Sequence, residues 1–242
     1  MEIRRHFAAG QQSPGALFGW LLAAALLAIW PGICSSAIVP GQIDDFQDGT
    51  TQNWTNGPVA NPVNVASGGP AGAFDRFLQI SSGTFGGGSR LVSFNQSQWT
   101  GNYLTAGVNA VAMDLKNFTG SPESIRIALR SGTGGSGTPG YSSTTAVSLP
   151  ADNAWHHAVF SLNAANLTAI NSPAALTTFL ASVADFRIVE AASAPSLLGD
   201  SGSFQVGVDN ITAVPEPTAL MLSASALSAL AYLAYRRRRA VA

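Results

Sequence analysis

The chain has 242 residues, of which 46% are hydrophobic and only 10% are charged, and its formal net charge is −1. This length can hold one domain with a sizeable core. Residues 38–214 contain six basic and eleven acidic side chains, a net charge of −5, so nucleic acid is not an expected partner.

The first 37 residues have the order of a secretory signal peptide. Two arginines precede an apolar run at 16–30, and small residues then lead to a predicted cleavage after Ala37. Cys34 is the only cysteine, and the bulky residue before it argues against a lipid-attachment site. Cleavage would leave a mature chain without thiols, which excludes disulfides and thiol catalysis. We therefore expect an exported protein.

The central region predicts an antiparallel β-sandwich, because short apolar and β-branched runs alternate with period two between Gly-rich loops. In the stretch IRIALR, Ile125, Ile127 and Leu129 should face the core, whereas Arg126 and Arg130 should face solvent. The predicted strands are 77–82, 90–94, 108–118, 124–131, 156–162, 185–190 and 204–214, and one short helix is predicted at 174–183.

Four stretches of the central region together resemble a known family. They are DDFQDGTTQNW (44–54), a middle strand pair containing MDLKNF and IRIALR, a Trp before a strand at Trp155, and VDNIT (208–212). They resemble jelly-roll domains of the galactose-binding-like and carbohydrate-binding-module type. The resemblance implies an all-β jelly-roll sandwich for residues 38–213, and it implies the fold more than the ligand.

The same resemblance implies a site for a structural Ca²⁺. In several carbohydrate-binding families the first and last strands lie side by side and hold the ion between them. Matching the motifs places Asp45, Asp48 and Asp209 as candidate ligands, and backbone carbonyls would have to complete the six to eight oxygens that calcium prefers. The alternative is that these aspartates cap turns or accept backbone amides.

The aromatic residues suggest where a sugar could bind. In WTGNY (99–103), the rings of Trp99 and Tyr103 could stack on a polysaccharide, although core packing of Trp99 is equally open. For Trp54 and Trp155 the sequence favours core packing. His156 and His157 are neighbours on a predicted strand, so they should face opposite sides and not bind one metal ion together.

No sequence pattern predicts an enzyme. The loop GTGGSGTPG (132–140) lacks the G-x-S-x-G spacing of a nucleophile elbow, and the sequence cannot show that carboxylates such as Asp114 and Glu123 face each other. We therefore expect a non-enzymatic protein that binds polysaccharide. A purely structural or adhesive envelope protein without a sugar site, and a glycan-active enzyme, remain as alternatives.

The last 29 residues combine three features in a fixed order. Val214 leads into Pro215, Glu216 and Pro217, and a weakly apolar stretch at 219–235 follows. This stretch is just long enough to form a transmembrane helix. An arginine cluster follows it and favours a cytoplasmic end. The cluster is Arg236, Arg237, Arg238 and Arg239.

This tail resembles the PEP-CTERM sorting signal of bacterial envelope proteins, which is also called the ice-binding protein C-terminal domain. In that family a membrane enzyme, exosortase, recognises the motif. The resemblance implies an inner-membrane precursor that is later released to the cell surface or an extracellular matrix. A permanent membrane anchor is the alternative. The sequence has no regular Thr array that would indicate ice binding.

Overall fold

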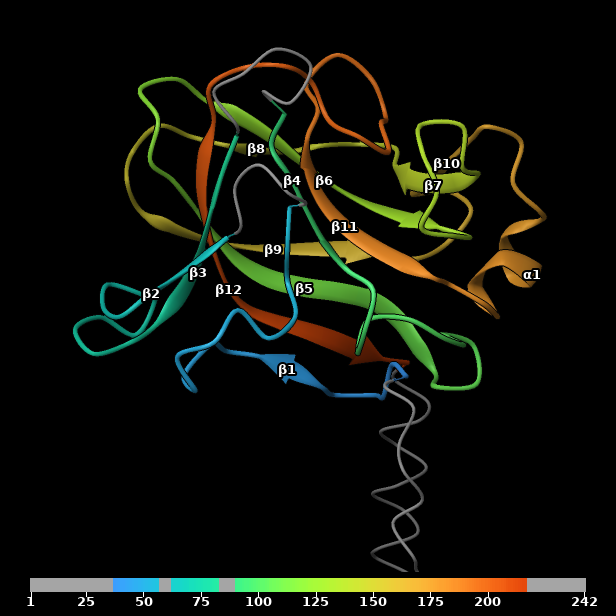
Figure 1. Ribbon diagram of the computed structural model, residues 1–242, viewed down its shortest axis with the longest axis horizontal. Helices are drawn as coiled ribbons and strands as arrows, with labels where there is room; N and C mark the ends of the chain where they lie inside the picture. Colours follow the sequence, from blue (N-terminus) through green and yellow to red (C-terminus); the bar gives the residue numbers. More distant parts are fainter. Residues whose placement is uncertain (1–36, 57–61, 83–89, 217–242) are drawn as a thin grey trace, which may run out of the picture. The chain divides into compact units, whose positions relative to one another are not determined.

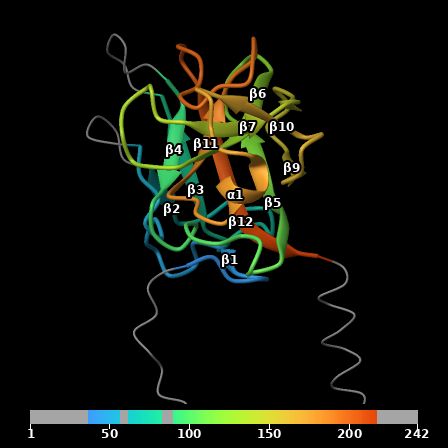
Figure 2. The same ribbon diagram turned by 90° about the vertical axis from the view of Figure 1, so that its right-hand side faces the viewer.

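Two six-stranded antiparallel sheets pack face to face in the computed structural model (Figures 1 and 2). The structure describes residues 37–56, 62–82 and 90–216, which belong to one compact unit. The predicted signal peptide before Ala37, the predicted span 219–235 and the arginine cluster lie outside the described residues. Within those three described ranges, no helix is long and apolar enough to cross a membrane.

The first sheet, called sheet A, contains both ends of the described chain. Its strand order is β2-β3-β12-β5-β9, and β1 also pairs with β12. The expectation that the first and last strands lie side by side is therefore confirmed, since Ile43 pairs with Thr212 and Asp44 with Ile211. The bounds are β1 Ile43–Asp44, β2 Val63–Val65, β3 Phe77–Ser81, β5 Val108–Asn117, β9 Trp155–Ser161 and β12 Gln205–Pro215.

The second sheet, called sheet B, has the order β10-β7-β6-β11-β4, with β8 paired to β6. One short helix, α1 (Leu176–Leu180), precedes β11 and buries Phe179 and Leu180. This agrees with the predicted position of the helix, although the helix is shorter than predicted. The strands of sheet B are β4 Val92–Asn95, β6 Glu123–Arg130, β7 Gly140–Ser143, β8 Val147–Leu149, β10 Leu167–Ile170 and β11 Asp185–Glu190.

The core lies between the two sheets and contains a cluster of packed aromatic rings. Trp54 and Trp99 are 1% and 0% exposed, and each packs on Phe186 with ring centroids 5.8 and 5.2 Å apart. Both indole Nε1 groups donate to Asp44 Oδ2 at 2.7 Å. Burial raises the pKa of Asp44, and the two indole donors and Gln98 partly offset this rise. The core placement of Trp54 is confirmed.

The alternation in IRIALR predicts that the outer face of sheet B is exposed to solvent. In the structure this face is covered. Arg126 and Arg130 do point away from the core, but they are only 6% and 1% exposed. The chain segments that follow β6 and β11 cover them, because Arg126 Nε donates to Ala191 O at 2.8 Å and Arg130 donates to the carbonyls of Gly134 and Gly135. The prediction of a wet face is wrong because loops at 131–139 and 191–202 fold back over it.

Candidate functional site

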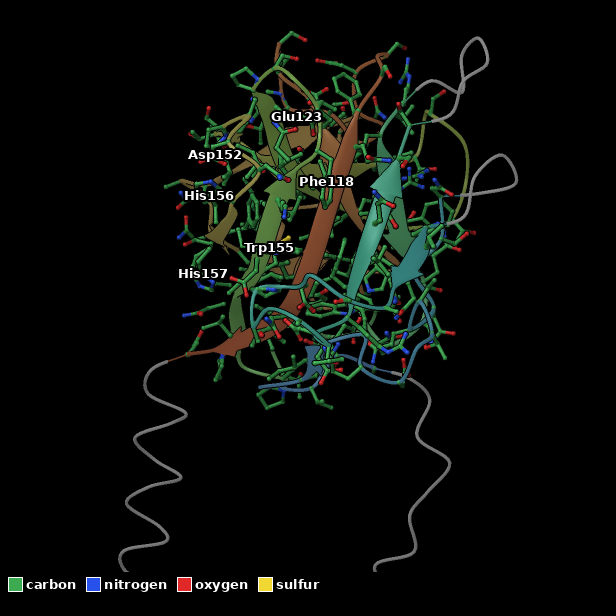
Figure 3. All side chains as sticks on the ribbon, turned by 90° about the vertical axis from the view of Figure 1, so that its left-hand side faces the viewer. Phe118, Glu123, Asp152, Trp155, His156 and His157 are labelled. Carbon is green, nitrogen blue, oxygen red and sulfur yellow. The ribbon has the colours of Figure 1, made fainter. Side chains whose placement is uncertain are left out.

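An aromatic cluster lies on the outer face of sheet A. We call Phe77, Phe118 and Trp155 the aromatic platform. Phe77 stacks on Phe118 with ring centroids 5.9 Å apart, and it meets Trp155 edge-on at 5.3 Å. Phe77 is buried, whereas Phe118 and Trp155 are partly exposed, so two rings of the platform are open to solvent. Figure 3 looks onto sheet A and labels Phe118 and Trp155.

Strand register explains why these rings meet. Lys116 on β5 pairs with Trp155 on β9 and with Gly207 on β12. Gly207 has no side chain, and a Cβ there would lie 2.9 Å from Trp155, 3.0 Å from Phe118 and 3.3 Å from Phe77. The rings therefore occupy the space that any other residue at 207 would fill. A glycine inside a strand was the sequence signal for this close approach.

Polar groups border the aromatic platform. Lys116 Nζ lies 5.2 Å from the centre of the Phe118 ring and 6.0 Å from that of Trp155, within cation–π range. Asp114 and His157 form the pair of residues two positions away from Lys116 and Trp155 on the same two strands. Asp114 Oδ1 lies 2.9 Å from Nδ1 of the exposed His157, and Asp114 Oδ2 accepts a hydrogen bond from Asn210 Nδ2 at 2.9 Å. Apolar rings and hydrogen-bonding groups thus share one face.

The two adjacent histidines take different partners, as their alternation predicts. His156 Nε2 lies 2.9 Å from Asp152 Oδ2 (Figure 3), whereas His157 pairs with Asp114 on the neighbouring strand β5. Asp114 and Glu123 also do not converge as a carboxylate pair. Glu123 is 2% exposed and its Oε1 accepts Thr119 Oγ1 at 2.8 Å, and burial raises its pKa.

A buried carboxylate, Asp209, lies next to the platform on β12. Asp209 is 0% exposed; its Oδ1 accepts the Asn210 amide at 2.8 Å, and its Oδ2 has no hydrogen-bond partner among the described residues. A register shift follows Asp209, and Asn210 adopts φ +50°, which Asn tolerates better than most residues. Burial, together with the charges of Asp75, Asp114 and Asp45, raises the pKa of Asp209 to about 7.

These carboxylates partly fit a calcium ion. Oxygen donors suit Ca²⁺, and a buried unpartnered carboxylate oxygen surrounded by like charges is what a cation would neutralise. However, the described ranges contain no group of three His, Cys, Asp or Glu side chains that could already hold a metal ion. Of the predicted set, the charge of Asp45 acts on Asp209, and the charges of Asp75 and Asp114 also act there.

Asp48, the third predicted calcium ligand, has a different environment. Asp48 Oδ1 accepts hydrogen bonds from the Thr50 amide at 2.8 Å and from the Thr50 hydroxyl at 2.9 Å. These bonds lower the pKa of Asp48. It lines a polar hollow with Thr51, Asn53 and Gln98. The turn-capping alternative describes Asp48 in this structure.

The predicted sugar-contact residues are wrong for this fold. Trp99 and Tyr103 are both 0% exposed; Tyr103 donates its hydroxyl to Trp99 O at 2.8 Å, and burial raises the pKa of Tyr103. Neither ring can reach a polysaccharide, because both lie in the core. The ring that the sequence assigned to the core, Trp155, lies instead on the surface.

Known proteins share the fold of this chain, although their sequences differ from it. Comparison of the sequence with protein-family models gives no match, and comparison with curated proteins also gives none. An exo-β-agarase structure matches with a TM-score of 0.51 and 10% identity, over 72% of this chain and 24% of that chain. This match shows a shared fold, and the region concerned is about a quarter of the agarase.

Two further matches are structures of the family 11 carbohydrate-binding module from Clostridium thermocellum. One, in complex with a β-1,3-1,4-mixed-linked tetrasaccharide, has a TM-score of 0.49 and 16% identity, over 73% of this chain and 96% of the module. The other has a TM-score of 0.48 and 14% identity, over 74% and 96%. The two antiparallel sheets and their strand order themselves make the described part of the chain an all-β antiparallel jelly-roll sandwich, as its sequence predicts.

Proposed function

We propose that this chain is an exported polysaccharide-binding protein that acts by binding and not by catalysis. The observation that supports the proposal is the aromatic platform on sheet A, where partly exposed rings of Phe118 and Trp155 lie beside Lys116 and the Asp114–His157 pair. Aromatic rings pack on the C–H face of a sugar, and charged or amide groups bind its hydroxyls. Adjacent, partly exposed apolar rings that are bordered by polar groups are a common feature of ligand-binding surfaces.

A retention assay on polysaccharide tests the proposal. The full chain, solubilised in a neutral detergent, is applied to agarose and to immobilised β-1,3-1,4-glucan, two polymers that the names of the matched structures suggest. We expect retention of the wild type, loss of retention in Trp155→Ala, and weaker retention in Lys116→Ala. Leu104→Ala is the matched control, because Leu104 is an exposed apolar residue outside the platform.

Two results would contradict the proposal. Wild-type protein that passes through every polymer would favour the structural or adhesive alternative. Release of soluble sugar from a polymer by the purified protein would favour the enzyme alternative. A circular-dichroism melt of each variant separates lost binding from lost folding.

We also propose that the tail is a PEP-CTERM sorting signal recognised by an exosortase-like enzyme, so that an inner-membrane precursor becomes a surface or matrix protein. The order of motif, apolar stretch and arginines supports this. In the structure β12 runs into the motif: Pro215 pairs with Val108, and the Glu216 amide donates to Gly107 O at 2.8 Å. The intact mass of the surface-exposed protein in the native host tests it; a mass that includes Ala242 would refute processing.

We propose Ca²⁺ as a structural cofactor near Asp209, held by Asp209 and Asp45 together with Asp75 or Asp114. When bound, the ion would neutralise carboxylates that otherwise repel one another. The unpartnered Asp209 Oδ2 supports this proposal. Asp45 follows β1 and Asp114 lies on β5, so these residues would tie the strands on both sides of β12.

A further inference from the structure

One aromatic side chain stands far out of the fold. Phe74 is 91% exposed, the highest value among the large apolar side chains that the structure describes; the others reach at most 58%. It lies in the loop 66–76 between β2 and β3. In Figure 1 this loop projects at the left, the side from which Figure 3 views sheet A. An isolated exposed apolar side chain is common, so this exposure alone assigns no role.

The backbone at Phe74 is unfavourable for its side chain. Its φ is +71°, in the left-handed region that a bulky residue rarely adopts. Glycine would fit there without this penalty, and the same loop uses glycine at Gly68 and Gly72, where φ is also positive. A bulky ring that is both strained and exposed contributes little to folding, and backbone strain is concentrated at functional sites.

The loop nevertheless holds Phe74 in a defined position. The Phe74 amide donates to Ser67 Oγ at 3.3 Å, the Ala71 amide to Asp75 Oδ2 at 2.7 Å, and the Gly69 amide to Asp75 O at 3.0 Å. Ordering a side chain or loop on binding normally costs affinity, and a loop that is already ordered avoids part of that cost.

The loop is also joined to the aromatic platform. Trp155 Nε1 donates to Gly68 O at 2.9 Å, and Phe77 follows Phe74 by three residues, so their Cα atoms are at most about 11 Å apart. A ligand that lies on Trp155 and Phe118 and continues toward β2 would therefore come within reach of Phe74.

We infer that Phe74 is a second stacking residue for the same polysaccharide chain, which extends the site from the aromatic platform onto loop 66–76. This inference rests on the proposed function. The ligand is an extended glycan chain with accessible C–H faces, because only a ligand longer than the platform would contact both places. A membrane fits less well, since Asp75 adjoins Phe74 and the central region carries a net charge of −5.

Variants at position 74 give a signature that a purely structural role would not give. In Phe74→Gly we expect a higher melting temperature, because glycine tolerates the positive φ, together with an affinity for the retained polymer about five- to tenfold weaker, as expected for one lost ring contact. Phe74→Trp, which keeps an aromatic ring at this position, should bind the polymer as the wild type does. Leu104→Ala, which removes an exposed apolar side chain elsewhere, should leave both quantities unchanged.

The outcomes separate the inference from the proposed function. If Trp155→Ala loses binding while Phe74→Gly binds the polymer as the wild type does, the inference is overturned and the proposed function stands. If the wild type binds neither agarose nor β-1,3-1,4-glucan, both are overturned. Sedimentation with phosphatidylcholine vesicles that depends on Phe74, without a change in polymer affinity, would assign the residue to a membrane surface and overturn the inference.

Discussion

Replacement of the buried Asp209 by asparagine should stabilise the protein at neutral pH when calcium is absent. The pKa of Asp209 is raised from 3.8 to about 7, mainly by burial. Each tenfold change in proton affinity corresponds to about 1.4 kcal/mol, so holding this carboxylate ionised in the fold costs roughly 4 kcal/mol. Asparagine keeps the acceptor for the Asn210 amide but has no charge to bury.

The sign of the pH dependence follows from the raised pKa. Between pH 4 and pH 7 the folded protein keeps a proton on Asp209 that the unfolded chain has released, so the stability of the wild type falls as the pH rises through this range. The penalty is about 1 kcal/mol at pH 4.5 and roughly 4 kcal/mol at pH 8. Above pH 7 it no longer grows.

Urea unfolding in EDTA at pH 4.5 and pH 8 measures this difference. We expect the advantage of Asp209→Asn over the wild type to grow by about 3 kcal/mol between the two pH values. Asp44, Glu123 and Glu190 also have raised pKa values, but they are present in both proteins and cancel in the comparison. An equal difference at both pH values, or a less stable variant at pH 8, would refute the assigned burial cost.

Three further predictions test other parts of the structure. Calcium should raise the melting temperature of the wild type and of Asp48→Asn in a calorimeter, but not that of Asp209→Asn; a loss of the effect in Asp48→Asn instead would restore the predicted ligand set. Gly207→Ala should displace the platform rings, destabilise the fold by about 1–3 kcal/mol in urea and abolish polymer retention; unchanged retention would remove the platform from the site. Asp185→Asn should cost about 3–5 kcal/mol of stability, because Asp185 Oδ2 accepts two bonds from buried Arg187 and one from Arg130, and a loss below 1 kcal/mol would contradict this.

Most strands could be predicted from the sequence because one of their faces packs in the core. The stretch 185–190 is predicted with its observed bounds, and 77–82, 108–118 and 204–214 differ from the structure by one residue at one or both ends. The short strands β2, β7, β8 and β10 were missed. They have three or four residues, too few to display an alternation.

The candidate site was harder to predict than the fold, because it depends on which segments cover which face. Trp99 and Trp155 both follow polar stretches of sequence, yet Trp99 lies in the core and Trp155 lies on the surface. Arg126 and Arg130 alternate correctly, but loops close over them. Phe77 and Phe118 meet Trp155 only through the register of β3, β12, β5 and β9, which local periodicity does not specify.

If the tail spans a membrane as proposed, the end of β12 would limit how far the sandwich can act from the bilayer. Glu216 is still hydrogen-bonded to Gly107, and the predicted span begins at Ala219, so only two residues separate them. From Glu216 to Ala219 the chain makes three steps between successive Cα atoms, which span at most about 11 Å when fully extended. While such a tail stays in place, the protein could bind only polymer that comes close to the membrane. Cutting the tail would convert a two-dimensional search along the membrane into free diffusion through the surrounding gel.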